Sequence, residues 1–315
     1  MKIAAIQMVV RLADVEENLK MAEGLATKAF SEGAELVVLP EFFTSAMAYH
    51  PKMLDVVRSI EGRPIQLLQT LARKHQGIVG GSFISLRGDE SYNTFVLAFP
   101  DGSTYFHDKD QPTMWENCYY IGGKDDGLFQ TPVGNIGVAL CWEFIRTRTV
   151  KRLWGRVDIV VGGSCWWTIP TESSVPGFSQ KLHQRNTEIM QETPARFARM
   201  LGVPVVHAAH AGHFEAEMPL MPHVPYKSYY LGETQIVDAR GEILARLSRE
   251  EGEGIIIADI DLTQKAAPSE RLLDRFWIPD MPPQLLSTWQ FMNKHGEGYY
   301  QKETKPYRAN HPLLD

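Results

Sequence analysis

The chain of 315 residues contains little cysteine, and its three cysteines are Cys118, Cys141 and Cys165. Three widely spaced cysteines leave at least one unpaired and include no CxxC pair. This pattern disfavours a disulfide-stabilised secreted domain and a zinc ribbon. A single reactive thiol is compatible with it, since a thiolate is a nucleophile that needs only a suitable environment.

Long apolar runs and long runs of like charge are also missing. Residues 1–8 have too short an apolar stretch and no small-residue cleavage site for a secretory signal, and no later stretch is long enough to cross a bilayer. The net charge of −6 is spread along the chain, which disfavours a nucleic-acid surface and a polybasic membrane patch. We therefore expect a cytoplasmic protein that acts on a small molecule, with no nucleic-acid or membrane partner.

The apolar residues that are present, 44% of the chain, suffice for a sizeable core. Their spacing predicts helices at 14–31, 63–75, 146–154, 179–201 and 284–295, and strands at 2–8, 35–39, 77–84, 92–99, 104–107, 136–140, 158–163, 203–208, 233–239, 242–245 and 254–260. Some strands alternate with helices, whereas others follow one another across a turn. This mixture predicts an α/β fold in which two mixed sheets pack face to face with helices outside.

The chain changes character after residue 267. Prolines and aromatic residues become frequent, and only 284–295 has a helical pattern. Such a segment cannot build a core by itself. We expect one domain at 1–267 and a C-terminal extension at 268–315 that packs on this domain or on a neighbouring subunit, which implies a homo-oligomer.

Three polar residues, Glu41, Lys109 and Cys141, stand at or just after the ends of predicted strands. Each alone is a weak signal, because acids and lysines are mostly exposed and a buried cysteine often packs as a small hydrophobe. Together they supply what acyl transfer requires: a thiol nucleophile, a carboxylate that takes its proton, and an ammonium that stabilises the tetrahedral intermediate. The backbone amide of Trp142 would add a second donor.

The motifs around these residues resemble those of the nitrilase superfamily, the carbon–nitrogen hydrolases with a Glu-Lys-Cys triad. They read LVVLPE at 36–41, DK at 108–109 and GVALCWE at 137–143, in the order and at the spacing of that family. The resemblance extends from residue 1 to about residue 262. It implies an α-β-β-α sandwich that dimerises, in agreement with the two mixed sheets expected above.

The resemblance also implies roles for individual residues. Cys141 is then the nucleophile, Glu41 the general base and acid, and Lys109 the cation that stabilises the intermediate. Glu116 occupies the place of a second glutamate that many members hold near the triad to position the lysine and the substrate, and we favour this role over the alternative of a surface acid in a long loop. Neither a metal nor an organic cofactor is implied.

Aromatic residues next to these motifs are candidates for a substrate pocket. Trp166 and Trp167 follow the strand that in the family ends beside the nucleophile, and Trp115 and Trp142 lie beside the second glutamate and the nucleophile. Each could equally fill the core. His207 is a further candidate, because it lies near a strand end where the family often has asparagine. An aromatic lining predicts an apolar or aromatic acyl group.

The bond that is cleaved stays open between an amide and a nitrile. The stretches CWE at 141–143 and PTMWE at 112–116 resemble nitrile-hydrolysing members. Amidases, which share the triad, make up the larger part of the superfamily, and we expect an amide. A nitrile would pass through a thioimidate before the thioester.

Two interpretations belong to other classes of function. His207, His210 and His213 are spaced in a way that suggests a metal site, but residues three apart on a strand point to opposite faces. A catalytically inactive scaffold subunit is the other alternative, and the complete triad disfavours it.

Overall fold

The computed structural model describes residues 1–170, 178–218, 221–311 and 313, and the account of the structure is confined to these. Thirteen strands are linked by backbone pairing. They are β1 Lys2–Met8, β2 Leu36–Val38, β3 Arg58–Ser59, β4 Ile78–Arg87, β5 Glu90–Ala98, β6 Thr104–Asp108, β7 Leu128–Thr131, β8 Gly134–Leu140, β9 Ile159–Ser164, β10 Val205–His210, β13 Thr234–Val237, β14 Ile243–Leu247 and β15 Gly254–Asp259.

The strands form two halves. One has the order β6-β5-β4-β2-β1-β15, with β3 beside β4, and the other has the order β7-β8-β9-β10-β13-β14. Where the halves meet, Gln7 and Met8 of β1 pair with Ala209 and His210 of β10. Each half contains parallel and antiparallel pairs, so two mixed sheets are joined at one corner.

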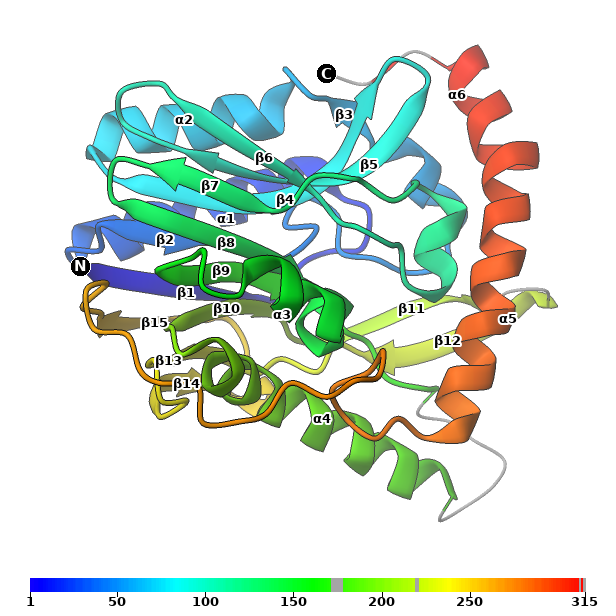
Figure 1. Cartoon of the computed structure of the whole chain (residues 1–315). Coiled ribbons are helices and arrows are strands. Elements are labelled where there is room, and N and C mark those ends of the chain that lie inside the picture. Colours follow the sequence, from blue (N-terminus) through cyan, green and yellow to red (C-terminus); the bar gives the residue numbers. More distant parts are fainter. Residues whose placement is uncertain (171–177, 219–220, 312, 314–315) are drawn as a thin grey trace.

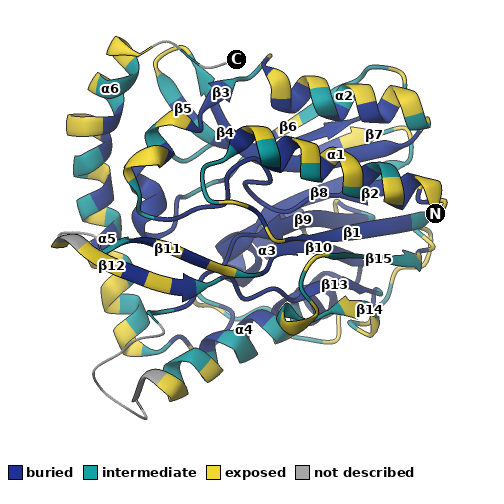
Figure 2. Ribbon diagram, turned by 180° about the vertical axis from the view of Figure 1, so that it is seen from behind, coloured by how far each residue is buried: buried dark blue, intermediate teal, exposed yellow. Residues whose placement is uncertain are grey.

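Helices cover the outer face of each half (Figure 1). They are α1 Val15–Ser31 and α2 Arg63–His75 on the first half, and α3 Thr147–Leu153 and α4 Phe178–Leu201 on the second. Side chains of β1 alternate accordingly, since Ile3 and Ala5 lie between the two halves while Ala4 and Ile6 lie on the helix side. Figure 2 shows that central strands such as β1, β8 and β9 are buried, and that the outer faces of helices α1, α2 and α4 carry exposed residues. The expected α-β-β-α sandwich is confirmed.

The start of α1 follows from its sequence. Asp14 accepts a hydrogen bond from the backbone N–H of Glu17 at 3.3 Å, as an N-cap residue does. Glu16 and Glu17 lie in the first turn and Lys28 in the last, which suits the helix dipole. The predicted helix boundary at residue 14 is therefore confirmed.

Several parts of the structure differ from the sequence-based expectation, among them the short strands β3 and β7, which were not expected. The helix expected at 146–154 begins only at Thr147, because Arg146 has an extended backbone and a 3₁₀ helix, η3 Cys141–Ile145, precedes it. A hairpin of β11 His213–Met218 and β12 Met221–Tyr229 was not expected.

The C-terminal extension is far more helical than its sequence suggests. It contains α5 Pro283–Tyr299, a π-helical turn η5 Tyr300–Thr304 and α6 Lys305–Asn310. The helix expected at 284–295 lies within α5, whereas the helical segments η5 and α6 were not expected. The glycines and prolines there lower intrinsic helix propensity, and packing of α5 on the domain overrides it. None of the helices in the described residues combines the length and apolar character needed to span a membrane.

Candidate active site

Four candidate residues from separate elements meet in one buried place. Glu41 follows β2, Lys109 follows β6, Glu116 lies in the 3₁₀ helix η2 Met114–Cys118, and Cys141 is the first residue after β8. Lys109 Nζ donates to Glu41 Oε1 at 2.9 Å and to Glu116 Oε2 at 2.7 Å. Cys141 Sγ and carboxylate oxygens of the two glutamates lie within 4.8 Å of one another. The four side chains are thus a single connected cluster.

The backbone is strained at Cys141 itself and close to Glu41 and Glu116. Cys141, Phe42 and Met114 adopt left-handed conformations with φ of 50°, 53° and 54°. Residues other than glycine rarely do so, at a cost of order 1–3 kcal/mol each, and such positions gather at functional sites. The turn at Cys141 follows directly on the extended Leu140, so the chain changes direction where the thiol is presented.

The Glu41 carboxylate is held by several donors. Asn93 Nδ2 donates to Oε1 at 2.9 Å and the backbone N–H of Cys165 donates to Oε2 at 2.9 Å. Burial raises the pKa of Glu41 to about 7, although the ammonium of Lys109 opposes this rise. A carboxylate with this pKa is suited to exchanging a proton near neutral pH.

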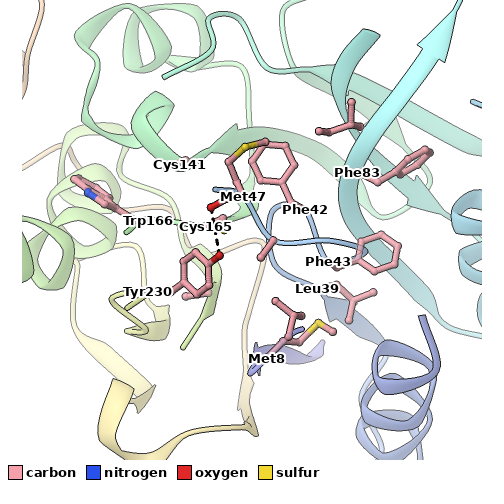
Figure 3. Close-up of a cluster of buried hydrophobic side chains, with 14 of the residues drawn as sticks. Met8, Leu39, Phe42, Phe43, Met47, Phe83, Cys141, Cys165, Trp166 and Tyr230 are labelled. Carbon is pink, nitrogen blue, oxygen red and sulfur yellow. Dashed lines mark hydrogen bonds between the residues drawn. The ribbon is translucent and has the colours of Figure 1, made fainter. Parts of the chain in front are cut away.

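The pKa values of the Cys141 thiol and the Lys109 ammonium are both raised, so both groups are protonated in the resting enzyme. Burial raises the pKa of Cys141 well above its usual value. Burial alone would lower the pKa of Lys109, but Glu116 and Glu41 raise it more, so the ammonium keeps its charge. Figure 3 shows the apolar side chains, including Phe42 and Cys165, among which Cys141 lies. The thiol therefore depends on a neighbouring base for its ionisation.

Glu143 links the turn that carries the thiol to the loop that carries the lysine. Its Oε2 accepts the backbone N–H of Leu140 at 2.8 Å and bonds His107 Nε2 at 3.0 Å, and its Oε1 accepts the N–H of Asp110 at 3.0 Å. Arg152 donates to Oε1 at 3.2 Å. One buried carboxylate thus fixes both segments.

Replacing Glu143 with alanine is expected to lower the free energy of unfolding by about 3–5 kcal/mol, because the buried His107, the partly buried Arg152 and two backbone donors lose their acceptor. Urea unfolding of the variant, with the exposed Glu23→Ala as control, measures this. A loss no larger than that of the control would contradict the linking role.

A cavity of about 250 Å³ opens beside Cys141. Its described lining residues are Thr113, Met114, Trp115, Cys141, Trp142, Trp166, Trp167, Thr168, Ile169, Pro170, Leu182, Asn186, Met218, Tyr226, Gln284, Leu285, Thr288 and Met292. None of these described residues is charged. The thiol is the one group of the four-residue cluster among them.

Helix α5 forms one wall of this cavity and also holds η2, the segment that carries the second glutamate. Asn293 Oδ1 accepts the backbone N–H of Met114 at 2.8 Å and Nδ2 of Asn117 at 3.0 Å. Gly296 packs so closely that a Cβ there would lie 2.6 Å from Cβ of Asn117. Further along, Thr304 Oγ1 donates to the carbonyl of Cys118 at 2.5 Å. The extension is therefore part of the site in its own chain.

The structure places four of the five candidate pocket residues on the cavity: Trp115, Trp142, Trp166 and Trp167. His207 lies elsewhere, with Nε2 accepting from the Ser164 hydroxyl at 2.8 Å and Nδ1 donating to a backbone carbonyl at 3.2 Å. Burial lowers the pKa of His207 to about 4, so it is a neutral core residue.

The three histidines of the metal hypothesis do not come together. His210 Nε2 donates to the backbone carbonyl of Glu41 at 2.7 Å, and the His213 side chain is exposed. Among the described residues, the group with metal-ligand spacing is formed instead by Glu41, Glu116 and Cys141, whose two carboxylates are bridged by an ammonium.

Several functional contacts were missed from the sequence. Asn93 bonds Glu41, the hydroxyl of Tyr120 donates to Glu116, and Asn293 holds η2. Asn93 alone left a signal, as a polar residue within an apolar strand. No pattern in the sequence indicated that α5 would line the cavity.

Comparisons with known proteins agree with the geometry. A family model described as carbon-nitrogen hydrolase matches residues 2–267. An omega-amidase of Bos taurus is 28% identical over 276 residues, covering 79% of this chain and 85% of that protein. A 2-oxoglutaramate amidase of Bacillus subtilis is 26% identical over 280 residues, covering 86% of this chain and 94% of that protein.

Solved structures share the fold. A carbon-nitrogen hydrolase from Helicobacter pylori superposes with a TM-score of 0.67 at 21% identity, covering 84% of this chain and 90% of that one. A mutant of an amidase of the nitrilase superfamily from Nesterenkonia superposes with a TM-score of 0.62 at 19% identity, covering 85% and 91%.

Proposed function

Because the chain belongs to the carbon–nitrogen hydrolase family, we propose that it hydrolyses a small amide to a carboxylic acid and ammonia or an amine through a thioester on Cys141. The observation that carries this proposal is the position of the thiol, within 4.8 Å of the carboxylates of Glu41 and Glu116 and on the wall of a cavity. Relatives that are named amidases support the choice of an amide.

The first half of the reaction forms the thioester. Glu41 takes the Sγ proton as sulfur attacks the carbonyl carbon, and negative charge develops on the carbonyl oxygen. Lys109 and the backbone N–H of Trp142 stabilise that charge. The C–N bond then breaks, and the proton held by Glu41 passes to the departing nitrogen.

The second half consumes water. The Glu41 carboxylate removes a proton from water as its oxygen attacks the thioester carbon, and collapse of this intermediate returns the thiol and releases the acid. Glu116 bonds the ammonium of Lys109 throughout and keeps it in place. The sum is one amide and one water converted to one acid and one amine.

The rate is expected to fall on the acidic side of neutrality. Glu41 must be deprotonated to accept the thiol proton, and its pKa is about 7. The kcat/KM should therefore lose about tenfold for each pH unit below 7, reaching roughly 100-fold at pH 5. Steady-state kinetics from pH 5 to 9 measure this, and a plateau that extends down to pH 5 would contradict a raised carboxyl pKa.

Ammonia release tests the bond class. A panel of aliphatic and aromatic amides, N-carbamoyl compounds and matched nitriles is assayed with the enzyme before and after alkylation by iodoacetamide. Release from amides that alkylation removes, with the adduct mapped to Cys141, supports the proposal. Release from nitriles alone would favour the second candidate, a nitrilase, which the CWE sequence at 141–143 suggests.

We also propose a cytoplasmic homo-oligomer whose catalytic domain is 1–267 and whose extension is 268–315. Three free cysteines support a reducing compartment. Phe291 on α5 is 58% exposed and Phe276 is 38% exposed, which supports a contact between copies. A monomeric mass by light scattering would contradict the assembly.

A further inference from the structure

We propose that this site selects small, uncharged amides with an aromatic acyl group, and that helix α5 supplies the wall that makes the selection. This inference rests on the proposed function, because it names the substrate class of the same site. It concerns the cavity beside Cys141 and the four α5 residues that line it, which are Gln284, Leu285, Thr288 and Met292.

The first step concerns charge. The polar groups among the described lining residues are all uncharged. They are the hydroxyls of Thr113, Thr168, Tyr226 and Thr288, the amides of Asn186 and Gln284, the indole N–H groups of the four tryptophans and the Cys141 thiol. A carboxylate or an ammonium on the acyl group would leave water and meet no opposite charge among the described lining residues, which is strongly unfavourable. A charged acyl group is therefore rejected.

Nearby arginines do not alter this conclusion. Arg146 is fully buried, and its Nη1 donates to Asp110 Oδ1 at 2.7 Å. Arg148 bonds the other oxygen of the same carboxylate at 2.7 Å. Both guanidinium groups are paired with Asp110, and neither arginine is among the lining residues of the cavity. The site has no free arginine among the described residues for capturing a carboxylate.

The second step concerns the rings. Trp115 and Trp167 stack with centroids 4.4 Å apart, Tyr226 meets Trp115 edge-on at 5.1 Å, and Trp142 and Trp166 lie 5.7 Å apart. An aromatic acyl group would extend this arrangement of offset and edge-to-face pairs. The stacked faces of Trp115 and Trp167 are turned to each other, which does not suit a cage for a cation.

The third step concerns size. A cavity of about 250 Å³ lies below the usual range of about 300–1,000 Å³ for ligand pockets. It suits a single ring on a short linker. Leu285, Thr288 and Met292 recur along one face of α5 and bound this space, so the helix limits both the length and the polarity of the acyl group.

The test compares four substrates by ammonia release. 3-Phenylpropionamide and hexanamide are uncharged, whereas 2-oxoglutaramate and N-carbamoylputrescine, the compounds for which relatives are named, carry a charged group. We expect kcat/KM to be highest for 3-phenylpropionamide and about 100-fold lower for either charged compound. Equal or better turnover of a charged compound would overturn this inference and leave the proposed function intact. No release from any amide, together with an iodoacetamide-unreactive Cys141, would instead remove the proposed function.

Variants of α5 test the wall itself. Leu285→Lys is expected to lower kcat/KM for 3-phenylpropionamide at least tenfold and to raise that for 2-oxoglutaramate, because it adds a positive charge at the pocket. Thr288→Lys, at an exposed position that tolerates lysine, should shift the ratio in the same direction. Gln290→Lys adds the same charge to an exposed residue of α5 that does not line the cavity, and it should leave both values unchanged. If Leu285→Lys and Thr288→Lys both fold and both keep the wild-type ratio of kcat/KM for the two substrates, the role of α5 is overturned.

Discussion

Cys141→Ala is expected to abolish amide hydrolysis, with a loss of kcat of about 10⁶-fold. The thiol is the group of the buried cluster that lines the cavity, so a substrate carbonyl meets sulfur before either carboxylate. Without sulfur there is no covalent intermediate, and only positioning and electrostatic stabilisation of a direct attack by water remain. The alanine removes one small buried atom, and the variant should fold normally.

The matched control is Cys118→Ala, the same change at another fully buried cysteine. Its pKa is raised by burial alone, without the influence of the two glutamates, and activity should be retained. Mass spectrometry of the wild type during turnover should show an acyl adduct on Cys141. Substantial activity in Cys141→Ala, or equal loss in Cys118→Ala, would contradict the nucleophile assignment.

Lys109→Met is expected to lower kcat/KM by about 10⁴-fold. The ammonium stabilises the developing oxyanion, and one such donor is typically worth about 10²–10³ in rate. It also separates Glu41 from Glu116, whose oxygens lie close together. Without it the two carboxylates cannot both ionise, so the pKa of Glu41 rises further and the base is largely protonated at neutral pH.

The Lys109→Met variant should also show a free energy of unfolding whose deficit relative to wild type depends on pH. Without the cation, the buried Glu41 carboxyl favours its protonated form in the folded state, so the penalty is fully present above its raised pKa and is relieved as pH falls towards the unfolded value. The deficit in unfolding free energy relative to wild type should be larger at pH 8 than at pH 5. Lys20→Met, at a side chain that is 69% exposed, is the control and should change neither quantity appreciably. A deficit independent of pH would contradict the coupling of the two glutamates through Lys109.

Much of this arrangement is visible in the sequence, because strand ends are local signals. The runs before Glu41 and Cys141 are apolar and β-branched, and each stops at a residue with chemistry, so sheet and candidate triad were predicted together. The strain at Cys141 and Phe42 could not be predicted, since tertiary contacts impose it. The hydrogen bond from the Met114 backbone N–H to Asn293 joins residues 179 positions apart, and such a contact produces no periodic pattern in the sequence.

Segments from opposite ends of the chain complete the structure, and this gives the enzyme an order of assembly. Strand β1 pairs along its length with β15, and η2 is held by Asn293 and Thr304. A ribosome that has made the thiol and the triad has not yet made these partners. The nascent chain therefore carries Cys141 before it carries the α5 residues that line the cavity beside it.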